Sequence, residues 1–475
     1  MSTTPARILN ADCLAALRDM PDASVDAVVT DPPYGLSNTT PAQVAETITQ
    51  WVTGNREYLP TGRGFMGHEW DGFVPPVAVW DECLRVLKPG GHLLAFAGSR
   101  THDLMTLGIR LAGFEIRDSV AWLYGSGFPK SLDVSKAIDK AGGDPLAFRR
   151  FAHAYAEAVS SSPYRHSEID RHLGVKSSSC YWARADHRGG LPPRHHWDKV
   201  RDLLGLPADL EALYDEAERE VIGVKKGAMS GWSMDGTTQF VDRDVTAPAT
   251  DAARQWEGWG TALKPAFEPI TLARKPLTGT VAANVLEHGT GALNIDGCRI
   301  YATDDDRALM EARSHPNGTK AGSNGGGIAM QFDKPHGFKS HPAGRWPANV
   351  VLDEPQAEEL DRQAGASRFM YVAKAPKSER PVVDGVAHPT VKPVTLSRWL
   401  VRMVTPPGGT VLDPFAGSGT TLEAAMLEGF NVIGVEREAD YLPLIRARIE
   451  RATTEMEARA EAEGGALFPI DGAAS

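Results

Sequence analysis

The segment VLDPFAGSGTTLEAA, residues 411–425, constrains the fold of this chain more than any other stretch. An apolar strand ends in a loop of small residues, and a helix follows at once. Only residues such as Gly417, Ser418 and Gly419 let the backbone of such a loop approach a ligand closely. A glycine loop alone would equally link an ordinary strand and helix. The next strand, NVIGVE, ends in Glu436, about 20 residues further on, where an acid can hold ribose hydroxyl groups. The pattern therefore predicts a nucleotide-type pocket.

A second motif, Asp31-Pro32-Pro33-Tyr34, follows the apolar strand VDAVVT. Ligands of a doubly wound sheet collect beyond the carboxyl ends of its strands, so this tetrapeptide is expected to line the cleft. The prolines stiffen the turn. Asp31 and the carbonyl group of Pro32 can accept hydrogen bonds from an amino group, and Tyr34 offers a ring for stacking. A plain structural turn is the alternative, but the set fits an extruded nucleobase.

Strands and helices alternate elsewhere in the chain. WDECLRVLKPGGHLLAFAGS reads as a helix, a turn at LKPGG and a strand, and FEIRDSVAWLY reads as a further strand. This alternation predicts an α/β fold with a parallel sheet. Five parts are expected. Residues 1–140 form a core segment with the DPPY motif, residues 141–230 form a helical insert that is a candidate for DNA recognition, and residues 231–345 form a loop-rich target-recognition region. Residues 346–450 form a core segment with the glycine loop, and residues 451–475 form an acidic helix with a tail. Residues 303–340 are expected to form a mobile loop.

Composition excludes several classes of protein. No apolar stretch approaches the roughly 20 residues that span a bilayer, and the first residues lack the pattern of a signal peptide, so a cytoplasmic protein without membrane contact is expected. The cysteines form no CxxC or Cys/His cluster, so no metal site is predicted. None of them follows a proline. Enzymes that methylate a ring carbon of cytosine need a cysteine nucleophile and normally place it directly after a proline, so this sequence argues against that chemistry. These cysteines are Cys13, Cys83, Cys180 and Cys298.

The two motifs, together with HPTVKP at residues 388–393, resemble those of the β-class amino-methyltransferases of DNA. In that family the DPPY motif precedes the recognition region and the glycine motif comes near the C-terminus, which is the order found here. The resemblance covers residues 7–130 and 341–450. GFMGHEWD, YGSGFPKS, KPAFEPI and GRWPANVV also resemble segments of bacteriophage and prophage members. The resemblance implies a Rossmann-like methyltransferase fold with permuted motif order and S-adenosyl-L-methionine as cofactor.

The resemblance also assigns roles to single residues. The tetrapeptide from Asp31 to Tyr34 would hold the target base. The residues expected around the cofactor are Asp413, Phe415, Gly417, Ser418, Gly419, Thr420 and Glu436, with Asp12 beside its adenine and His388, Thr390 and Lys392 beside its methionine end. For His388 and Asp12, a helix-start residue and a turn former are the alternatives.

The expected function is site-specific transfer of a methyl group to N6 of a flipped adenine in duplex DNA. The first alternative is N4 methylation of cytosine, whose enzymes usually carry Ser in place of Asp31. Relatives that act on RNA or protein commonly begin the tetrapeptide with Asn and lack a long insert. The alternative from a different class is a non-catalytic DNA-binding protein with a decayed core. A homodimer and a restriction endonuclease partner are left open.

A net charge of −11 does not exclude DNA binding, because one basic face is sufficient. Between Arg165 and Arg201 the chain has eight basic and four acidic side chains, and HSEIDRHLGVKSSSCYWARAD reads as helix, glycine turn and helix, as in a helix-turn-helix. A packing or dimerisation module is the alternative. KPAFEPITLARKP could contact DNA beside the insert or instead of it. The candidate DNA-binding residues are Arg184, Arg188, Lys264, Arg274 and Lys275.

Overall fold

The chain divides into two compact units. One comprises Met1–Gly127 with Ala266–Ser475, and the other comprises Phe128–Pro265. The computed structural model describes residues 6–37, 39–62, 71–125, 127, 131–141, 146–175, 178–184, 190–217, 221–232, 238–248, 250–301, 344–364, 366–367, 370–373, 381–383, 385–388 and 391–465. None of the helices in these ranges combines the length and apolar character that crossing a bilayer requires. The segment 303–340, Arg188, Thr390 and the tail after residue 465 lie outside the described residues.

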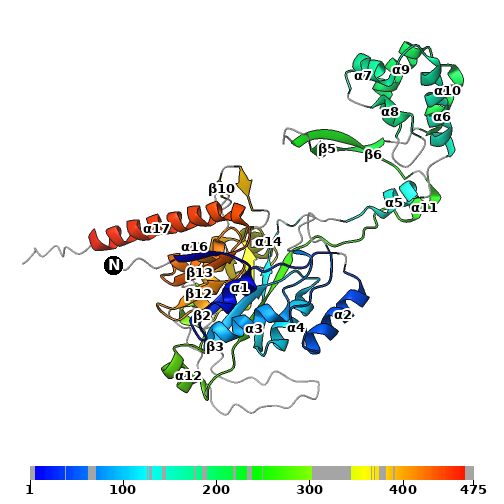
Figure 1. Cartoon of the computed structure of the whole chain (residues 1–475). Coiled ribbons are helices and arrows are strands. Elements are labelled where there is room, and N and C mark those ends of the chain that lie inside the picture. Colours follow the sequence, from blue (N-terminus) through cyan, green and yellow to red (C-terminus); the bar gives the residue numbers. More distant parts are fainter. Residues whose placement is uncertain are drawn as a thin grey trace, which may run out of the picture. The chain divides into compact units, whose positions relative to one another are not determined.

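A nine-stranded sheet organises the first unit (Figure 1). Its strands, in spatial order, are β1 (Ala6–Asn10), β13 (Asn431–Glu436), β12 (Thr410–Asp413), β2 (Val25–Thr30), β3 (Leu87–Phe96), β7 (Phe267–Arg274), β4 (Glu115–Leu123), β8 (Val350–Asp353) and β9 (Tyr371–Ala373). β7 is antiparallel to both neighbours, and every other pair in this sheet is parallel. The expected parallel sheet is therefore correct except for β7.

Helices cover both faces of this sheet. Along β2, which is buried throughout, Val28 packs into a cluster with α1 (Cys13–Arg18), α3 (Val77–Val86) and α4 (His102–Leu111). Its neighbours Ala27 and Val29 point the other way, into a cluster with α15 (Val394–Val404), α16 (Thr420–Leu427) and α17 (Leu442–Gly465). A strand buried on both faces is typical of a three-layer α/β fold. The first unit therefore has the expected Rossmann-like architecture.

The remaining elements of the first unit are short or peripheral. They are α2 (Pro41–Val52), α12 (Val281–His288), η3 (Asp296–Cys298), α14 (Glu354–Ala364), β10 (Val382–Val383), β11 (Val386–Ala387) and η6 (Ala439–Tyr441). LKPGG is the first part of β3 and not the expected turn. Likewise β7 lies within the range expected for target recognition but is a strand of the core sheet. The second unit separates β7 from β4 in the sequence, so the local pattern did not show that the two strands belong to the same sheet.

The second unit contains a helical module with its own core. Its elements are α5 (Val134–Ala141), α6 (Leu146–Ser161), α7 (His166–Leu173), α8 (Ser179–Trp182), α9 (Arg194–Leu204), α10 (Ala208–Ala217), β5 (Val221–Trp232), β6 (Thr238–Thr246) and α11 (Asp251–Gln255). Phe151, Tyr155, Trp197 and Tyr214 are buried against one another, and the rings of Trp197 and Tyr214 stack with centroids 4.7 Å apart. All residues of this core belong to the second unit, and aromatic pairs of this kind stabilise the packing of its helices.

The expected helix, glycine turn and second helix are present in this module. α7 ends at Gly174, whose φ of +70° suits a glycine cap. Asp170 Oδ1 then accepts hydrogen bonds from the backbone N–H groups of Ser178 and Ser179, 3.2 and 2.8 Å away, and so fixes the start of α8. However, α8 has only four residues and ends at Trp182, so Arg184 follows it in an irregular segment.

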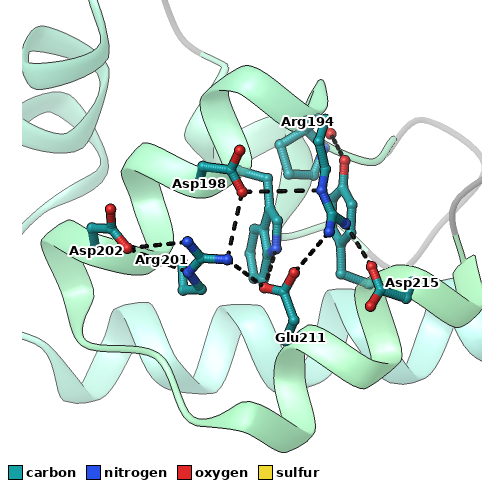
Figure 2. Close-up of polar contacts among 9 residues, drawn as sticks. Arg194, Asp198, Arg201, Asp202, Glu211 and Asp215 are labelled. Atoms are coloured by element: carbon teal, nitrogen blue, oxygen red, sulfur yellow. Dashed lines mark hydrogen bonds and ion pairs between the residues drawn. The ribbon is translucent and has the colours of Figure 1, made fainter.

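The expectation of a basic insert is wrong for the face formed by α9 and α10. Arg194 pairs with Glu211 and Asp215 at 3.0 and 2.5 Å, and Arg201 pairs with Asp198 and Glu211 at 3.5 and 3.3 Å (Figure 2). Glu211 and Asp215 lie on α10, after the segment from Arg165 to Arg201, and they neutralise two arginines of that segment. This face therefore offers no excess positive charge.

Candidate active site

The two sequence motifs meet at one edge of the sheet. β2 and β12 are parallel neighbours, so their carboxyl ends lie side by side. Thr30, the last residue of β2, donates a hydrogen bond of 2.6 Å from Oγ1 to Asp413 Oδ1 at the end of β12. The same oxygen accepts a bond from the N–H group of Phe415, 3.1 Å away. The turn with Asp31 and the glycine loop are therefore joined through buried side chains.

The side chain of Asp413 fixes the start of the glycine loop. Its side chain is buried, and burial raises its pKa to about 6, although the bonds from Thr30 and Phe415 act in the opposite direction. A carboxylate that bonds to the first residues of a loop fixes the path of the backbone. The structure thus gives Asp413 contacts to its own loop and to β2.

The glycine loop closes around Glu436. Gly417 and Gly419 have φ angles of +51° and +83°, which other residues adopt only with strain. The N–H group of Gly417 donates to Glu436 Oε2 at 2.7 Å, and the N–H group of Glu438 donates to Glu436 Oε1 at 2.8 Å. Burial raises the pKa of Glu436. Each carboxylate oxygen can accept a second bond, so Glu436 can still hold a hydroxyl group of a nucleoside.

Three further residues expected at the cofactor, His388, Ser418 and Thr420, lie at or beside this loop. Gly417 leaves room for His388, because a Cβ atom at Gly417 would lie 3.1 Å from His388 Nε2. The ring of His388 also contacts Tyr441 edge to face, with centroids 4.7 Å apart. Ser418 Oγ and Thr420 Oγ1 lie 3.3 Å apart.

Asp12 is the N-cap of α1. It accepts hydrogen bonds from the N–H groups of Leu14 and Ala15, at 3.0 and 3.2 Å. A side-chain cap of this kind satisfies backbone donors that the first turn of a helix leaves unpaired. Asp12 therefore has a local structural role at the start of α1, and a contact between Asp12 and a cofactor remains a prediction.

The hydroxyl group of Tyr34 lies between two carboxylates. It is 2.8 Å from Asp31 Oδ1 and 2.9 Å from Glu268 Oε2, on β7. Lys392 Nζ lies 2.7 Å from Asp31 Oδ2 and 3.4 Å from Glu268 Oε2. Asp31, Tyr34, Glu268 and Lys392 are named the Tyr34 cluster below. Asp31 and Tyr34 follow β2, Glu268 lies on β7 and Lys392 precedes α15, so three distant segments of the sequence meet here.

Burial and the two acids determine the protonation of this cluster. Burial alone would lower the pKa of Lys392, but Asp31 and Glu268 together raise it, so the ammonium group is retained. Burial, Asp31 and Glu268 all hold the pKa of the Tyr34 hydroxyl well above its usual value. Tyr124, just after β4, also bonds to Glu268, and burial with this acid raises its pKa to about 12. Both hydroxyl groups therefore remain hydrogen-bond donors at neutral pH.

The turn from Asp31 to Tyr34, named the Tyr34 turn, is fixed at its backbone by two further side chains. Asp71 Oδ1 accepts hydrogen bonds from the N–H groups of Tyr34 and Gly35, at 2.9 and 3.0 Å. Thr101 Oγ1 donates to the carbonyl oxygen of Tyr34 at 2.6 Å. Gly35 has a φ of +67°, and a Cβ atom there would lie 2.7 Å from the backbone nitrogen of Val74. The turn is therefore held in one conformation from both sides.

Sequence reasoning missed Glu268, Tyr124 and Asp71. Glu268 belongs to KPAFEPI and Asp71 ends GFMGHEWD, so both stood in segments that resemble phage relatives. The longer segment KPAFEPITLARKP, which includes Glu268, is predicted to contact DNA because of Lys264, Arg274 and Lys275. A single acid in a predicted loop carries no pattern that reveals which strand end it faces. Only the position of β7 between β3 and β4 brings Glu268 to Tyr34.

The predicted DNA-binding residues have different environments. Arg184 and Lys264 are exposed in irregular segments of the second unit. Arg274 is buried and pairs with Glu115 at 2.6 Å, and Lys275 donates to the carbonyl oxygen of Leu87 at 2.7 Å. Arg274 and Lys275 therefore both have partners within the first unit, which argues against the predicted contact of these two side chains with DNA.

Comparison with known proteins identifies relatives over parts of the chain. Type II methyltransferase M.BglI of Bacillus subtilis is 31% identical over 154 residues, which cover 32% of this chain and 38% of that protein. YubD of Escherichia coli strain K12 is 50% identical over 54 residues, which cover 11% of this chain and 24% of that protein. The matched region thus spans less than half the length of either relative.

Solved structures give only weak likenesses. The M1.HpyAVI–SAM complex has 12% sequence identity and a TM-score of 0.34, with coverage of 94% of this chain and 99% of the other. The PvuII DNA methyltransferase, described as cytosine-N4-specific, has 13% identity and a TM-score of 0.36, with coverage of 96% and 93%. Likenesses this weak do not establish the fold, which follows from the sheet order and from the helices on both faces of the sheet.

A family model gives the widest match. The model of the DNA methylase family, named for N6 and N4 methyltransferases, matches residues 25–160 and 243–447, more than half of the chain. The matched residues include the Tyr34 cluster, the glycine loop and Glu436. The unmatched stretch between them falls within the second unit. The chain therefore belongs to the DNA methylase family.

Proposed function

We propose that this chain is a site-specific DNA methyltransferase that transfers a methyl group from S-adenosyl-L-methionine to N6 of adenine. The observation that carries the proposal is the hydrogen bond between Thr30 and Asp413, which joins an acceptor-rich turn to a glycine loop at one sheet edge. A methyl donor and an amino acceptor must meet at one place for transfer. The adjacency of the two motifs at the carboxyl ends of β2 and β12 supports the proposal.

The loop residues fit the nucleoside part of this cofactor. Gly417 and Gly419 allow close approach of the backbone, and Glu436 keeps acceptor capacity beside them. The residues proposed to line the cofactor are Phe415, Gly417, Ser418, Gly419, Thr420, Glu436 and His388, with Asp413 acting through the loop path. When bound, the cofactor supplies a sulfonium-activated methyl group, so no covalent protein nucleophile is required.

The Tyr34 turn is proposed to position the target amino group. Its lone pair is delocalised into the ring of the base, which makes the nitrogen a poor nucleophile. Hydrogen bonds from the amino group to the Asp31 carboxylate and the carbonyl oxygen of Pro32 would draw the nitrogen toward tetrahedral geometry. The lone pair is then available for in-line attack, and the released proton passes to solvent. The base must first leave the duplex, at a cost of a few kcal/mol, which stacking on Tyr34 partly offsets.

Adenine is proposed over cytosine because the tetrapeptide begins with Asp31. N4-cytosine methylation is the second candidate, since the same turn geometry serves both amino groups. The family match is common to N6 and N4 enzymes, so the identity of the base rests on this residue alone.

Sequence recognition is proposed to involve the second unit. There α7 and α8 flank a turn that Asp170 fixes, and the side chains of Arg184 and Lys264 are exposed. Side chains at such positions reach phosphates or base edges.

Calorimetry with the purified chain tests the cofactor half of this proposal. Titration with S-adenosyl-L-methionine in the absence of DNA should give a single saturable site. A radiolabelled methyl group should then appear in duplex DNA. A chain that binds no cofactor and labels no DNA would contradict the proposed function.

A further inference from the structure

We propose that Glu268 is a positioning residue for methyl transfer: it takes over the Tyr34 hydroxyl and steadies Lys392 when Asp31 turns its carboxylate to the target amino group. This inference rests on the proposed function and deepens it, because it gives a role in the same site to a residue outside both sequence motifs.

The first step concerns the hydroxyl group of Tyr34. A phenol hydroxyl has one hydrogen. That of Tyr34 nevertheless lies within hydrogen-bonding distance of two carboxylate oxygens, 2.8 Å from Asp31 and 2.9 Å from Glu268. It can donate to one of them at a time, and the two distances favour neither. Tyr34 can therefore exchange partners by rotation of its hydroxyl group alone, while the ring stays in place.

The second step concerns Asp31. Both of its oxygens already face a donor: Oδ1 faces the Tyr34 hydroxyl and Oδ2 faces Lys392. A target amino group brings a further donor to the same carboxylate. Rotation of the Tyr34 hydroxyl toward Glu268 releases Oδ1 for the amino group. Without a carboxylate at position 268, the hydroxyl would remain on Asp31 Oδ1, and this oxygen would divide its acceptor capacity between the hydroxyl and the target amino group.

The third step concerns charge. Asp31 and Glu268 contribute two negative charges, and Lys392 contributes one positive charge in contact with both. The side chains of Asp31 and Glu268 are only 24% and 19% exposed, so water screens this excess negative charge incompletely. An acceptor-rich site of this kind favours a base edge that donates hydrogen bonds. Glu268 therefore also favours an amino group over a carbonyl group at the target position.

The test is the variant Glu268→Gln, which keeps the shape of the side chain but removes its charge. Charge-assisted hydrogen bonds are about twice as strong as neutral ones, so the amide should hold the Tyr34 hydroxyl poorly. The single-turnover rate of methyl transfer should fall at least tenfold, while the KM for DNA and the Kd for S-adenosyl-L-methionine change less than twofold. Glu268→Asp, which keeps the charge, should recover part of the rate.

Glu115→Gln is the matched control. Glu115 pairs with Arg274 at the far end of β7, away from the Tyr34 cluster, so its loss should leave the rate within twofold of the native value. Thermal unfolding of each variant checks that the fold is intact.

Coupling to Tyr34 separates positioning from a merely structural role. In a Tyr34→Phe background the hydroxyl is absent, so Glu268→Gln should cost less than about threefold more. Equal losses in both backgrounds, or a native rate in Glu268→Gln, would overturn the role of Glu268. A native chain that transfers no methyl group would instead contradict the proposed function itself.

Discussion

Thr30 and Asp413 are 383 residues apart in the sequence, yet their side chains share a buried hydrogen bond of 2.6 Å. One closes the strand before the Asp31 turn, and the other begins the glycine loop. Because β2 and β12 are adjacent and parallel, the two motifs occupy the same edge of the sheet despite the second unit inserted between them. The relation of base site to cofactor loop therefore depends on the sheet and on this bond.

The glycine loop is expected to lose cofactor binding when a side chain is added to it. Gly417→Leu places atoms beside His388, 3.1 Å from its Nε2 at the Cβ alone, and strains a φ of +51°. The affinity for S-adenosyl-L-methionine should fall more than tenfold in calorimetry. Gly62→Leu, where a Cβ atom meets open space, is the control. Unchanged affinity in the Gly417 variant would remove the loop from the cofactor site.

Asp31→Ala should separate binding from chemistry. Among the described residues, its hydrogen bond and its ion pair are with Tyr34 and Lys392, so cofactor affinity should change less than threefold. Methyl transfer should become undetectable or fall at least a hundredfold, because the amino group loses its acceptor. Asp22→Ala removes an exposed acid and should remain active. Near-native transfer by Asp31→Ala would refute the proposed mechanism.

The buried carboxyl group of Asp413 predicts how stability depends on pH. Its pKa is raised from 3.8 to about 6, so the folded state binds the proton more tightly than the unfolded state does. The stability that this proton contributes is present below pH 4 and is lost as the pH rises through 6. Asp413→Asn keeps a neutral side chain, so its stability relative to the native chain should rise by on the order of 3 kcal/mol between pH 4 and 7. Denaturant unfolding at both pH values measures this difference. A difference that does not depend on pH would contradict the raised pKa.

The ion pairs of α9 and α10 are expected to stabilise the helical module and to take no part in DNA binding. Glu211 contacts Arg194, Arg201 and the indole N–H group of the buried Trp197. Because the two arginines are partly exposed, Glu211→Gln should lower the free energy of unfolding by only about 1 kcal/mol. Its affinity for duplex DNA in fluorescence anisotropy should not change.

Arg184→Ala is the matched comparison, since Arg184 is exposed in the irregular segment that follows α8. We expect weaker DNA binding with little change in stability. The opposite result would be native DNA binding by Arg184→Ala together with loss of DNA binding by Glu211→Gln. It would assign DNA binding to the face formed by α9 and α10 and not to Arg184.

Local pattern predicted most of the core and only part of the site. The strand VDAVVT, the glycine loop and the final strand each carry their signal within a few residues, and they appear as β2, the β12–α16 loop and β13. Glu268 could not be found in this way, because its contact with Tyr34 spans 234 residues and depends on the antiparallel insertion of β7. The ion pairs of Arg194 and Arg201 were missed for a similar reason, since their acids lie on the following helix. A contact between distant segments produces no periodic pattern of residues, so it cannot be predicted from a single stretch of sequence.

The nature of the methylated base tests the central claim most directly. Duplex DNA treated with the purified chain and S-adenosyl-L-methionine, then digested to nucleosides, should yield N6-methyladenine by mass spectrometry. The Asp31→Ala chain, treated in parallel, should yield none. N4-methylcytosine alone would contradict the choice of adenine, and the absence of any methylated nucleoside would contradict the assignment of methyl transfer to this site.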